Sequence, residues 1–153
     1  QGHQHKGASV IECLVNCVIF NNGTHNWIAD REMRAEHSIV LKHGEKMIFG
    51  KEKDKGLALD YTQGVIPQLI VVSADDERVL VHDATQKDST LHRMLAMMGA
   101  EGDTTLPIAL GVIRNVEEDS YDSAVNQQIN QVRQQSKATT FDQLTATLEQ
   151  WEI

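Results

Sequence analysis

Cys13 and Cys17, the two cysteines of the chain, are four residues apart. Cysteine thiolates bind metals, but a structural zinc site takes four ligands, so two thiols would need further partners. His5 and His25 are the nearest imidazoles in sequence and could complete a Cys-and-His site. The alternative is that both residues are buried free thiols, which is common for cysteine. The spacing leaves both interpretations open.

His82 is followed by Asp83, directly after the apolar run Val79–Val81. A neighbouring carboxylate could orient the imidazole of His82, as it does for metal-binding histidines. More often such a pair closes a turn. No serine lies on a nucleophile elbow, and no glycine-rich phosphate loop is present.

The length and charge of the chain exclude several functional classes. The 153 residues (17.1 kDa) suit one domain, and a net charge of -8 with a pI near 5.3 disfavours binding to duplex nucleic acid. The sequence contains no apolar run of the roughly 20 residues that a membrane span needs. Two cysteines form no disulfide framework, so a reducing, cytoplasmic setting is expected. The lysine-rich segment Glu45–Lys55 is also acidic, which favours a solvated hairpin over a phosphate or partner-protein contact.

Apolar patterning predicts the elements that position these residues. We expect short strands in β-branched or apolar runs, at Ala8–Val15, Lys46–Phe49, Gly56–Leu59, Gln68–Val72, Val79–Val81 and Ile108–Ile113. We expect helices where apolar residues recur at helical spacing, at Ser89–Met98, from Tyr121 to Ser136 after the N-cap Ser120, and from the N-cap Thr140 onward. Residues Asn26–Ala35 predict a short helix or a charged loop. The fold class is therefore mixed α/β, with the helices concentrated late in the chain.

The predicted core combines residues of these strands and helices: Leu69, Val71, Leu91, Leu95, Val125, Ile129, Leu144, Leu148 and Trp151.

Several blocks of sequence carry a resemblance to a known family. The blocks are His5–Glu12, Asn16–Gly23, Leu41–Lys51, Val81–Asp83 and Leu110–Arg114 followed by Tyr121-Asp122. In this order they resemble the β subunit of 2-oxoacid:ferredoxin oxidoreductases, from about Lys6 to Trp151. Asn22 departs from the pattern, because an acidic residue is expected there. The block Lys42–Lys51 favours the 2-oxoglutarate type over the pyruvate type.

The resemblance implies an enzyme that oxidatively decarboxylates a 2-oxoacid to an acyl-coenzyme A and passes electrons to ferredoxin. It also implies thiamin diphosphate, magnesium and a 4Fe-4S cluster in the full enzyme, and an α subunit as partner. Cys17 matches the fourth cysteine ligand of the β-subunit cluster, and four thiolates hold such clusters. Cys13 matches no ligand and is predicted to lie in the core.

The chain is expected to be a C-terminal portion of such a subunit. Residues 1–24 would be the end of the thiamin-binding domain, with the segment Ala8–Val15 as its last strand, and residues 25–153 would be the C-terminal extension. Gly102-Asp103 is followed by Thr104, where the thiamin and magnesium motif has a glycine. We therefore expect the isolated chain to be inactive, with no catalytic residue of its own, and to bind neither cofactor. The alternative is an autonomous, non-catalytic α+β module that docks subunits or ferredoxin.

Separation from its sheet would leave the first strand unpaired. We expect residues 1–20 to be disordered, exchanged with a neighbouring copy or buried in a homo-oligomer contact.

Overall fold

The computed structural model describes residues 2–62, 64–99, 105–136, 138 and 140–146. These residues divide into two units, one of residues 12–117 and one of residues 1–11 with 118–153. No helix among the described residues is long and apolar enough to cross a membrane.

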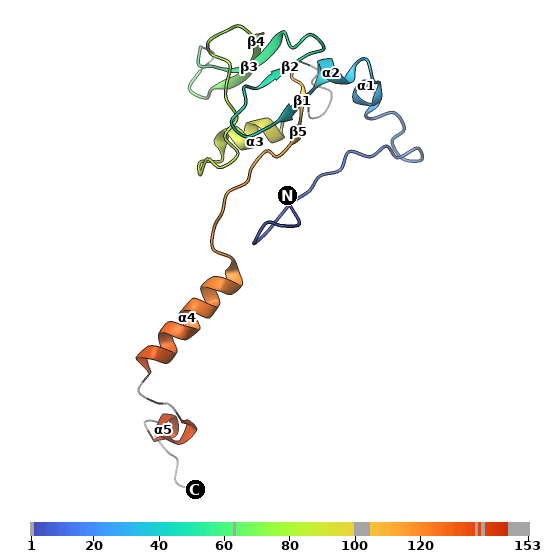
Figure 1. Ribbon diagram of the computed structural model, residues 1–153. Coiled ribbons are helices and arrows are strands. Elements are labelled where there is room, and N and C mark those ends of the chain that lie inside the picture. The colour runs from blue at the N-terminus through green and yellow to red at the C-terminus, as the bar shows by residue number, and fades with distance from the viewer. Residues whose placement is uncertain (1, 63, 100–104, 137, 139, 147–153) are drawn as a thin grey trace. The chain divides into compact units, whose positions relative to one another are not determined.

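Two small sheets form the framework of the 12–117 unit (Figure 1). Strand β1 (Ser38–Leu41) pairs in parallel with β5 (Ile108–Gly111). Strands β2 (Ile48–Phe49), β3 (Lys55–Asp60) and β4 (Gln68–Ser73) form an antiparallel sheet in that order. The predicted hairpin and the predicted strand at Gln68–Val72 are therefore confirmed.

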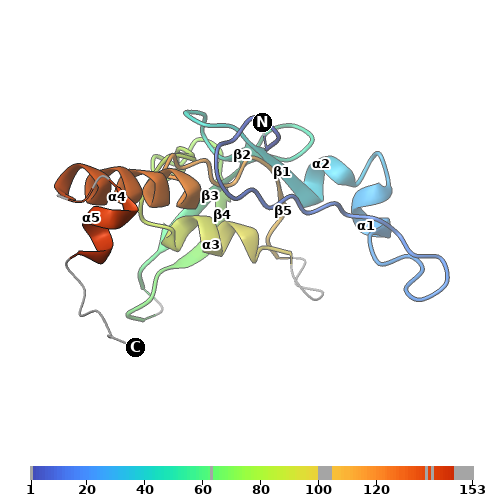
Figure 2. The same cartoon turned by 90° about the horizontal axis from the view of Figure 1, so that it is seen from below.

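The core of this unit lies between the sheets and helix α3 (Thr90–Ala96), which Figure 2 shows in front of β3 and β4 when the molecule is viewed from below. Its buried apolar side chains come from β1, β2, β3, α3 and the segments beside β2 and α3: Ile39, Leu41, Met47, Phe49, Leu57, Leu95 and Met98.

 The predicted core residue Leu95 is thus fully buried, and Leu69 and Leu91 pack against this cluster.

Other predicted core residues do not lie in it. Val71, Ile129 and Leu144 are exposed, and Val125 is half-buried; these predictions were wrong. None of the residues of β4 is buried, and the late helices belong to the other unit. Leu148 and Trp151 lie outside the described residues.

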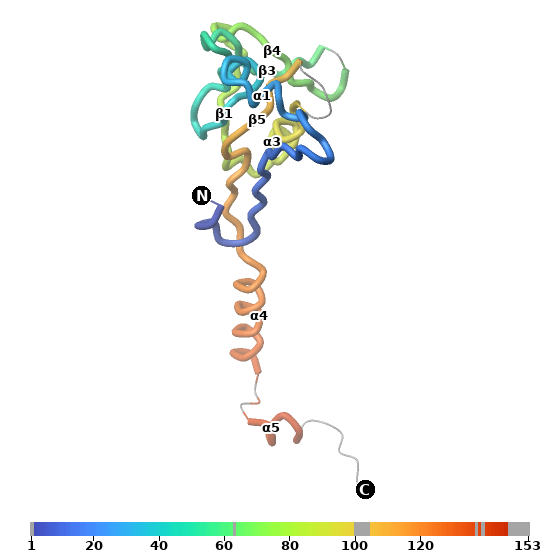
Figure 3. Tube along the Cα trace, turned by 90° about the vertical axis from the view of Figure 1, so that its right-hand side faces the viewer, coloured from blue at the N-terminus to red at the C-terminus, as the bar shows by residue number. Residues whose placement is uncertain are grey.

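The other unit contains α4 (Tyr121–Gln135), drawn as one regular coil in Figure 3, and α5 (Phe141–Thr145). Both N-caps are confirmed, because the Ser120 hydroxyl accepts from the Ser123 N–H and the Thr140 hydroxyl accepts from the Gln143 N–H. Neither helix has a buried residue.

The expected strand over Ala8–Val15 does not form. Residues 8–16 have no regular secondary structure, and Val10, Ile11 and Val15 are exposed. A strand needs a neighbour for its backbone hydrogen bonds, and no described strand pairs with this segment. Val79–Val81 also forms no strand; only Val81 makes an isolated bridge, to Lys46.

The segment predicted as a helix or a charged loop contains two single helical turns. These are α1 (Asn26–Ala29) and α2 (Arg34–His37), which lead into β1. Strand β1 was not predicted, although Ile39, Val40 and Leu41 are apolar and two of them are β-branched.

Candidate functional site

Cys17 lies in a tight loop that we call the cysteine loop, residues 16–24. The N–H of Asn21 donates to the carbonyl of Cys17 at 3.0 Å, which closes the loop across its base. The Thr24 hydroxyl donates to the carbonyl of Asn21 at 2.9 Å and fixes the side of the loop that leads to α1. The turn that Asn21-Asn22-Gly23 predicts is therefore present, with Gly23 at a φ of 86°.

The side chain of Asn16 forms a second closure of the cysteine loop. Its Oδ1 accepts from the N–H of Gly23 at 2.9 Å, and its Nδ2 donates to Oδ1 of Asn22 at 3.1 Å. The Asn16 carboxamide thus binds the backbone of Gly23 and the side chain of Asn22. Asn16 belongs to the block that carries the family resemblance, but its role in closing the loop depends on contacts with residues 22 and 23 that the sequence pattern does not reveal.

The cysteine loop directs backbone N–H groups toward the thiol of Cys17. Hydrogen bonds from the N–H groups of Phe20 and Ile19, in that order of importance, lower the pKa of the Cys17 thiol. Donors around the sulfur favour the thiolate, which is the form that binds metals. Cys17 is an exposed free thiol.

Cys13 does not belong to this arrangement. It is exposed as a free thiol, so the prediction that it lies in the core was wrong. It lies in the segment without a strand, and burial there depended on a sheet that the described residues do not form.

The described residues place no group of three or more His, Cys, Asp or Glu together as a metal site. The interpretation of Cys13, Cys17, His5 and His25 as one zinc site therefore has no support in the described structure. A 4Fe-4S cluster needs four thiolates, and the chain has two cysteines. Cys17 fits as one ligand of such a cluster, and the remaining ligands would have to come from other polypeptide.

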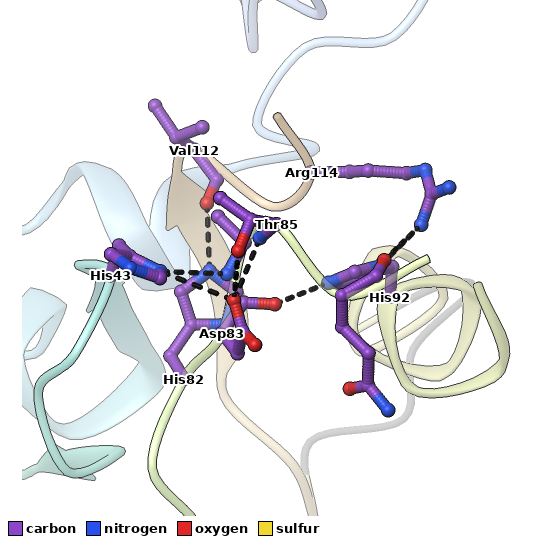
Figure 4. Close-up of polar contacts among 9 residues, drawn as sticks. His43, His82, Asp83, Thr85, His92, Val112 and Arg114 are labelled. Carbon is purple, nitrogen blue, oxygen red and sulfur yellow. Dashed lines mark hydrogen bonds and ion pairs between the residues drawn. The ribbon is translucent and has the colours of Figure 1, made fainter. Parts of the chain in front are cut away.

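A second polar cluster is formed by His82, which follows Val81, and His92, in the first turn of α3 (Figure 4). Both rings are buried, and their centroids are 6.1 Å apart. Nε2 of His82 lies 2.9 Å from the carbonyl of Val112. Nε2 of His92 lies 2.8 Å from the carbonyl of Asp83. Since a carbonyl only accepts, each Nε2 carries the proton.

Arg114 completes this cluster from the segment after β5. Its guanidinium donates to the carbonyls of Gln86 and Lys87 and lies 2.9 Å from Nδ1 of His92. Because a guanidinium has no acceptor, Nδ1 of His92 must accept, and the ring is neutral. Arg114 and His92 thus hold the segment after Asp83 to the end of β5.

Asp83 closes a turn, as the more frequent interpretation of the His82-Asp83 pair predicts. Its carboxylate accepts from the hydroxyl and the N–H of Thr85, at 2.6 and 2.9 Å. These two hydrogen bonds lower the pKa of the Asp83 carboxyl. The carboxylate lies 3.3 Å from Nδ1 of His43. Asp83 therefore contacts the imidazole of His43 and not that of its sequence neighbour His82. The buried rings of His82 and His92 brace the core unit, whereas the imidazole of His43 is exposed beside Asp83.

The comparisons with known proteins agree with the sequence resemblance. Over 138 residues, or 90% of this chain, the sequence is 28% identical to the 2-oxoglutarate oxidoreductase subunit KorB of Mycobacterium tuberculosis. The chain spans 35% of the length of that protein. No family model and no solved structure matches the chain. The similarity to a 2-oxoacid oxidoreductase subunit that the sequence blocks indicated is thereby confirmed.

Proposed function

We propose that this chain forms part of the β subunit of a 2-oxoacid:ferredoxin oxidoreductase. The observation that carries the proposal is the similarity to KorB over 90% of the chain. The enzyme would oxidatively decarboxylate a 2-oxoacid to an acyl-coenzyme A and pass the electrons to ferredoxin. The chain spans about a third of KorB, so the proposal assigns it a share of the subunit and of its reaction.

The proposed substrate is 2-oxoglutarate in preference to pyruvate. The name of KorB supports this choice, as does the block Lys42–Lys51 of this chain. In the structure this block contains β2 and turns that bring Lys46 beside Val81.

In the proposed enzyme, Cys17 is a ligand of the 4Fe-4S cluster. Its exposure and the backbone N–H groups that lower its pKa support this role. Thiamin diphosphate with magnesium would supply the decarboxylation chemistry, bound by residues outside this chain, because the chain lacks the motif for that cofactor. What this chain contributes is the folded 12–117 unit and the ordered loop that presents the thiol.

The test is to purify the complex that forms around a tagged copy of this chain in its native cells. The assay follows reduction of a viologen dye with coenzyme A and either 2-oxoglutarate or pyruvate as substrate. The proposal predicts coenzyme A-dependent reduction, faster with 2-oxoglutarate. A complex with an α subunit that reduces the dye with neither 2-oxoacid would contradict the proposal and favour a non-catalytic docking module.

A further inference from the structure

Asn22 and Gly23 form the single Asn-Gly pair of the sequence, and it lies in the cysteine loop. Asn-Gly pairs are chemically labile, because glycine has no Cβ to hinder attack of its backbone nitrogen on the preceding side chain. In that reaction the Gly23 nitrogen bonds to Cγ of Asn22, and Nδ2 leaves as ammonia, which gives a cyclic imide. Water then opens the ring to aspartate or isoaspartate. The exposed position of Asn22 gives water access to it.

Asn16 binds both groups that this reaction joins. Its Oδ1 accepts from the Gly23 N–H, the nucleophile, at 2.9 Å. Its Nδ2 donates to Oδ1 of Asn22, on the carbon that is attacked, at 3.1 Å. The next turn adds a constraint, since the carbonyl of Gly23 accepts from the N–H of Asn26 at 3.0 Å. The peptide unit around Gly23 is therefore held on both sides.

These contacts oppose ring closure. The Gly23 nitrogen must lose its proton to attack, and an amide oxygen accepts a hydrogen bond but is too weak a base to take the proton. The hydrogen bond therefore keeps the proton on the nitrogen. The second bond fixes the Asn22 carboxamide toward Asn16, and rotation of that group toward the Gly23 nitrogen breaks it.

We propose that Asn22 is a site of spontaneous deamidation and that Asn16 restrains it. When the restraint is lost, deamidation proceeds. It converts the Asn22 carboxamide to a carboxylate and adds one negative charge to the cysteine loop. The isoaspartate product also inserts a methylene group into the main chain beside the Cys17–Asn21 closure. The modification would therefore accumulate where the loop is open or unfolded and mark those copies of the chain.

The test follows the mass gain of peptide 16–26 in the purified 153-residue chain, in mildly alkaline buffer, over time. The folded wild-type chain is compared with the same chain in denaturant and with the folded variants Asn16→Ala and Asn16→Asp. Asn126→Ala, which alters an exposed asparagine in α4, is the matched control, and Asn22→Gln identifies the reacting residue. Circular dichroism establishes that each variant is folded.

Deamidation in the folded wild type is expected to be at least about fivefold slower than in denaturant, the factor that corresponds to one hydrogen bond of ordinary net strength. Asn16→Ala should approach the denatured rate, and Asn126→Ala should match the wild type. Asn16→Asp keeps the acceptor for the Gly23 N–H and should lie between them. Equal rates in the folded and denatured wild type, unchanged rates in both Asn16 variants, or a mass gain that persists in Asn22→Gln would each overturn the proposal.

Discussion

At the scale of single residues, the two cysteines differ in what surrounds them. Cys17 lies in a loop closed by backbone and side-chain hydrogen bonds, and neighbouring N–H groups lower its pKa. Cys13 lies in a segment with no regular structure. The difference arises from the turn residues Asn21, Asn22 and Gly23, which allow the chain to fold back on Cys17.

Glu36 provides a residue-scale prediction about pH. Its carboxylate accepts from the Lys55 ammonium and from the Lys51 N–H, and these contacts, with Lys55 first, lower its pKa. A lowered carboxyl pKa in the folded state contributes stability above the unfolded pKa, here about 4.5, and that stability is lost as pH falls through the folded value. Glu36→Gln should therefore lower the urea midpoint at neutral pH.

The difference in urea midpoint between Glu36→Gln and wild type should shrink as the pH falls below the pKa of the carboxyl in the unfolded chain. Urea titrations over an acidic pH series measure this. Glu52→Gln, which alters an exposed carboxylate in the turn between β2 and β3, is the control and should have little effect. A difference that stays constant with pH would mean that the Glu36–Lys55 contact does not contribute through charge.

Sequence patterns predicted the residues of the turns and caps better than the residues with tertiary partners. The hydrogen bonds of the turn and cap residues join positions only a few residues apart, so local sequence specifies them. These residues are Asn22-Gly23 in the cysteine loop, Ser120 and Thr140. The Arg114 guanidinium donates hydrogen bonds to the carbonyls of Gln86 and Lys87, nearly thirty residues away, and no local sequence pattern indicates these bonds.

At the scale of elements, β1 and β5 meet at an unusually close backbone approach. Gly111 has a φ of 92°, and a Cβ at this position would lie 2.7 Å from the carbonyl oxygen of Leu41, a backbone atom that cannot move aside alone. The position therefore requires glycine for two reasons, its backbone conformation and the space.

Gly111→Ala should destabilise the chain more than Gly44→Ala. Gly44 also has a positive φ, of 81°, but no atom lies within 4 Å of a Cβ built there. Gly44→Ala should therefore cost only the conformational strain, about 1 kcal/mol, and Gly111→Ala should cost at least about 1 kcal/mol more. Equilibrium urea unfolding measures both. Equal losses would show that the β1–β5 contact relaxes around the added methyl group.

The elements predicted correctly are those whose partners are close in sequence, such as the hairpin of β2 and β3. Parallel pairing of β1 with β5 joins segments about seventy residues apart, and pattern alone does not reveal it. The segment Ala8–Val15 has the pattern of a strand but no described partner, so its composition misled the prediction.

At the scale of the whole molecule, the chain combines one unit with its own core and segments that expose apolar side chains. Val10, Ile11, Val15 and Phe20 are exposed in the N-terminal part of the chain. We predict that residues 8–15 exchange their amide hydrogens rapidly in the dilute chain, whereas Leu57 and Ala58 of β3 exchange slowly.

Light scattering over a range of concentrations complements this exchange experiment. Association with concentration, together with slower exchange of residues 8–15, would agree with the predicted homo-oligomer contact or exchange between copies. A monomer in which residues 8–15 are as protected as β3 would contradict the account of these residues and favour the autonomous docking module.

We propose that Cys17 of this chain is a ligand of the iron–sulfur cluster of a 2-oxoacid oxidoreductase. The most direct measurement is the iron content and visible spectrum of the native complex purified with Cys17→Ser or Cys13→Ser in this chain. We expect Cys17→Ser to lose or destabilise the cluster and Cys13→Ser to retain it. Equal iron content and equal spectra in the two variants would contradict the claim.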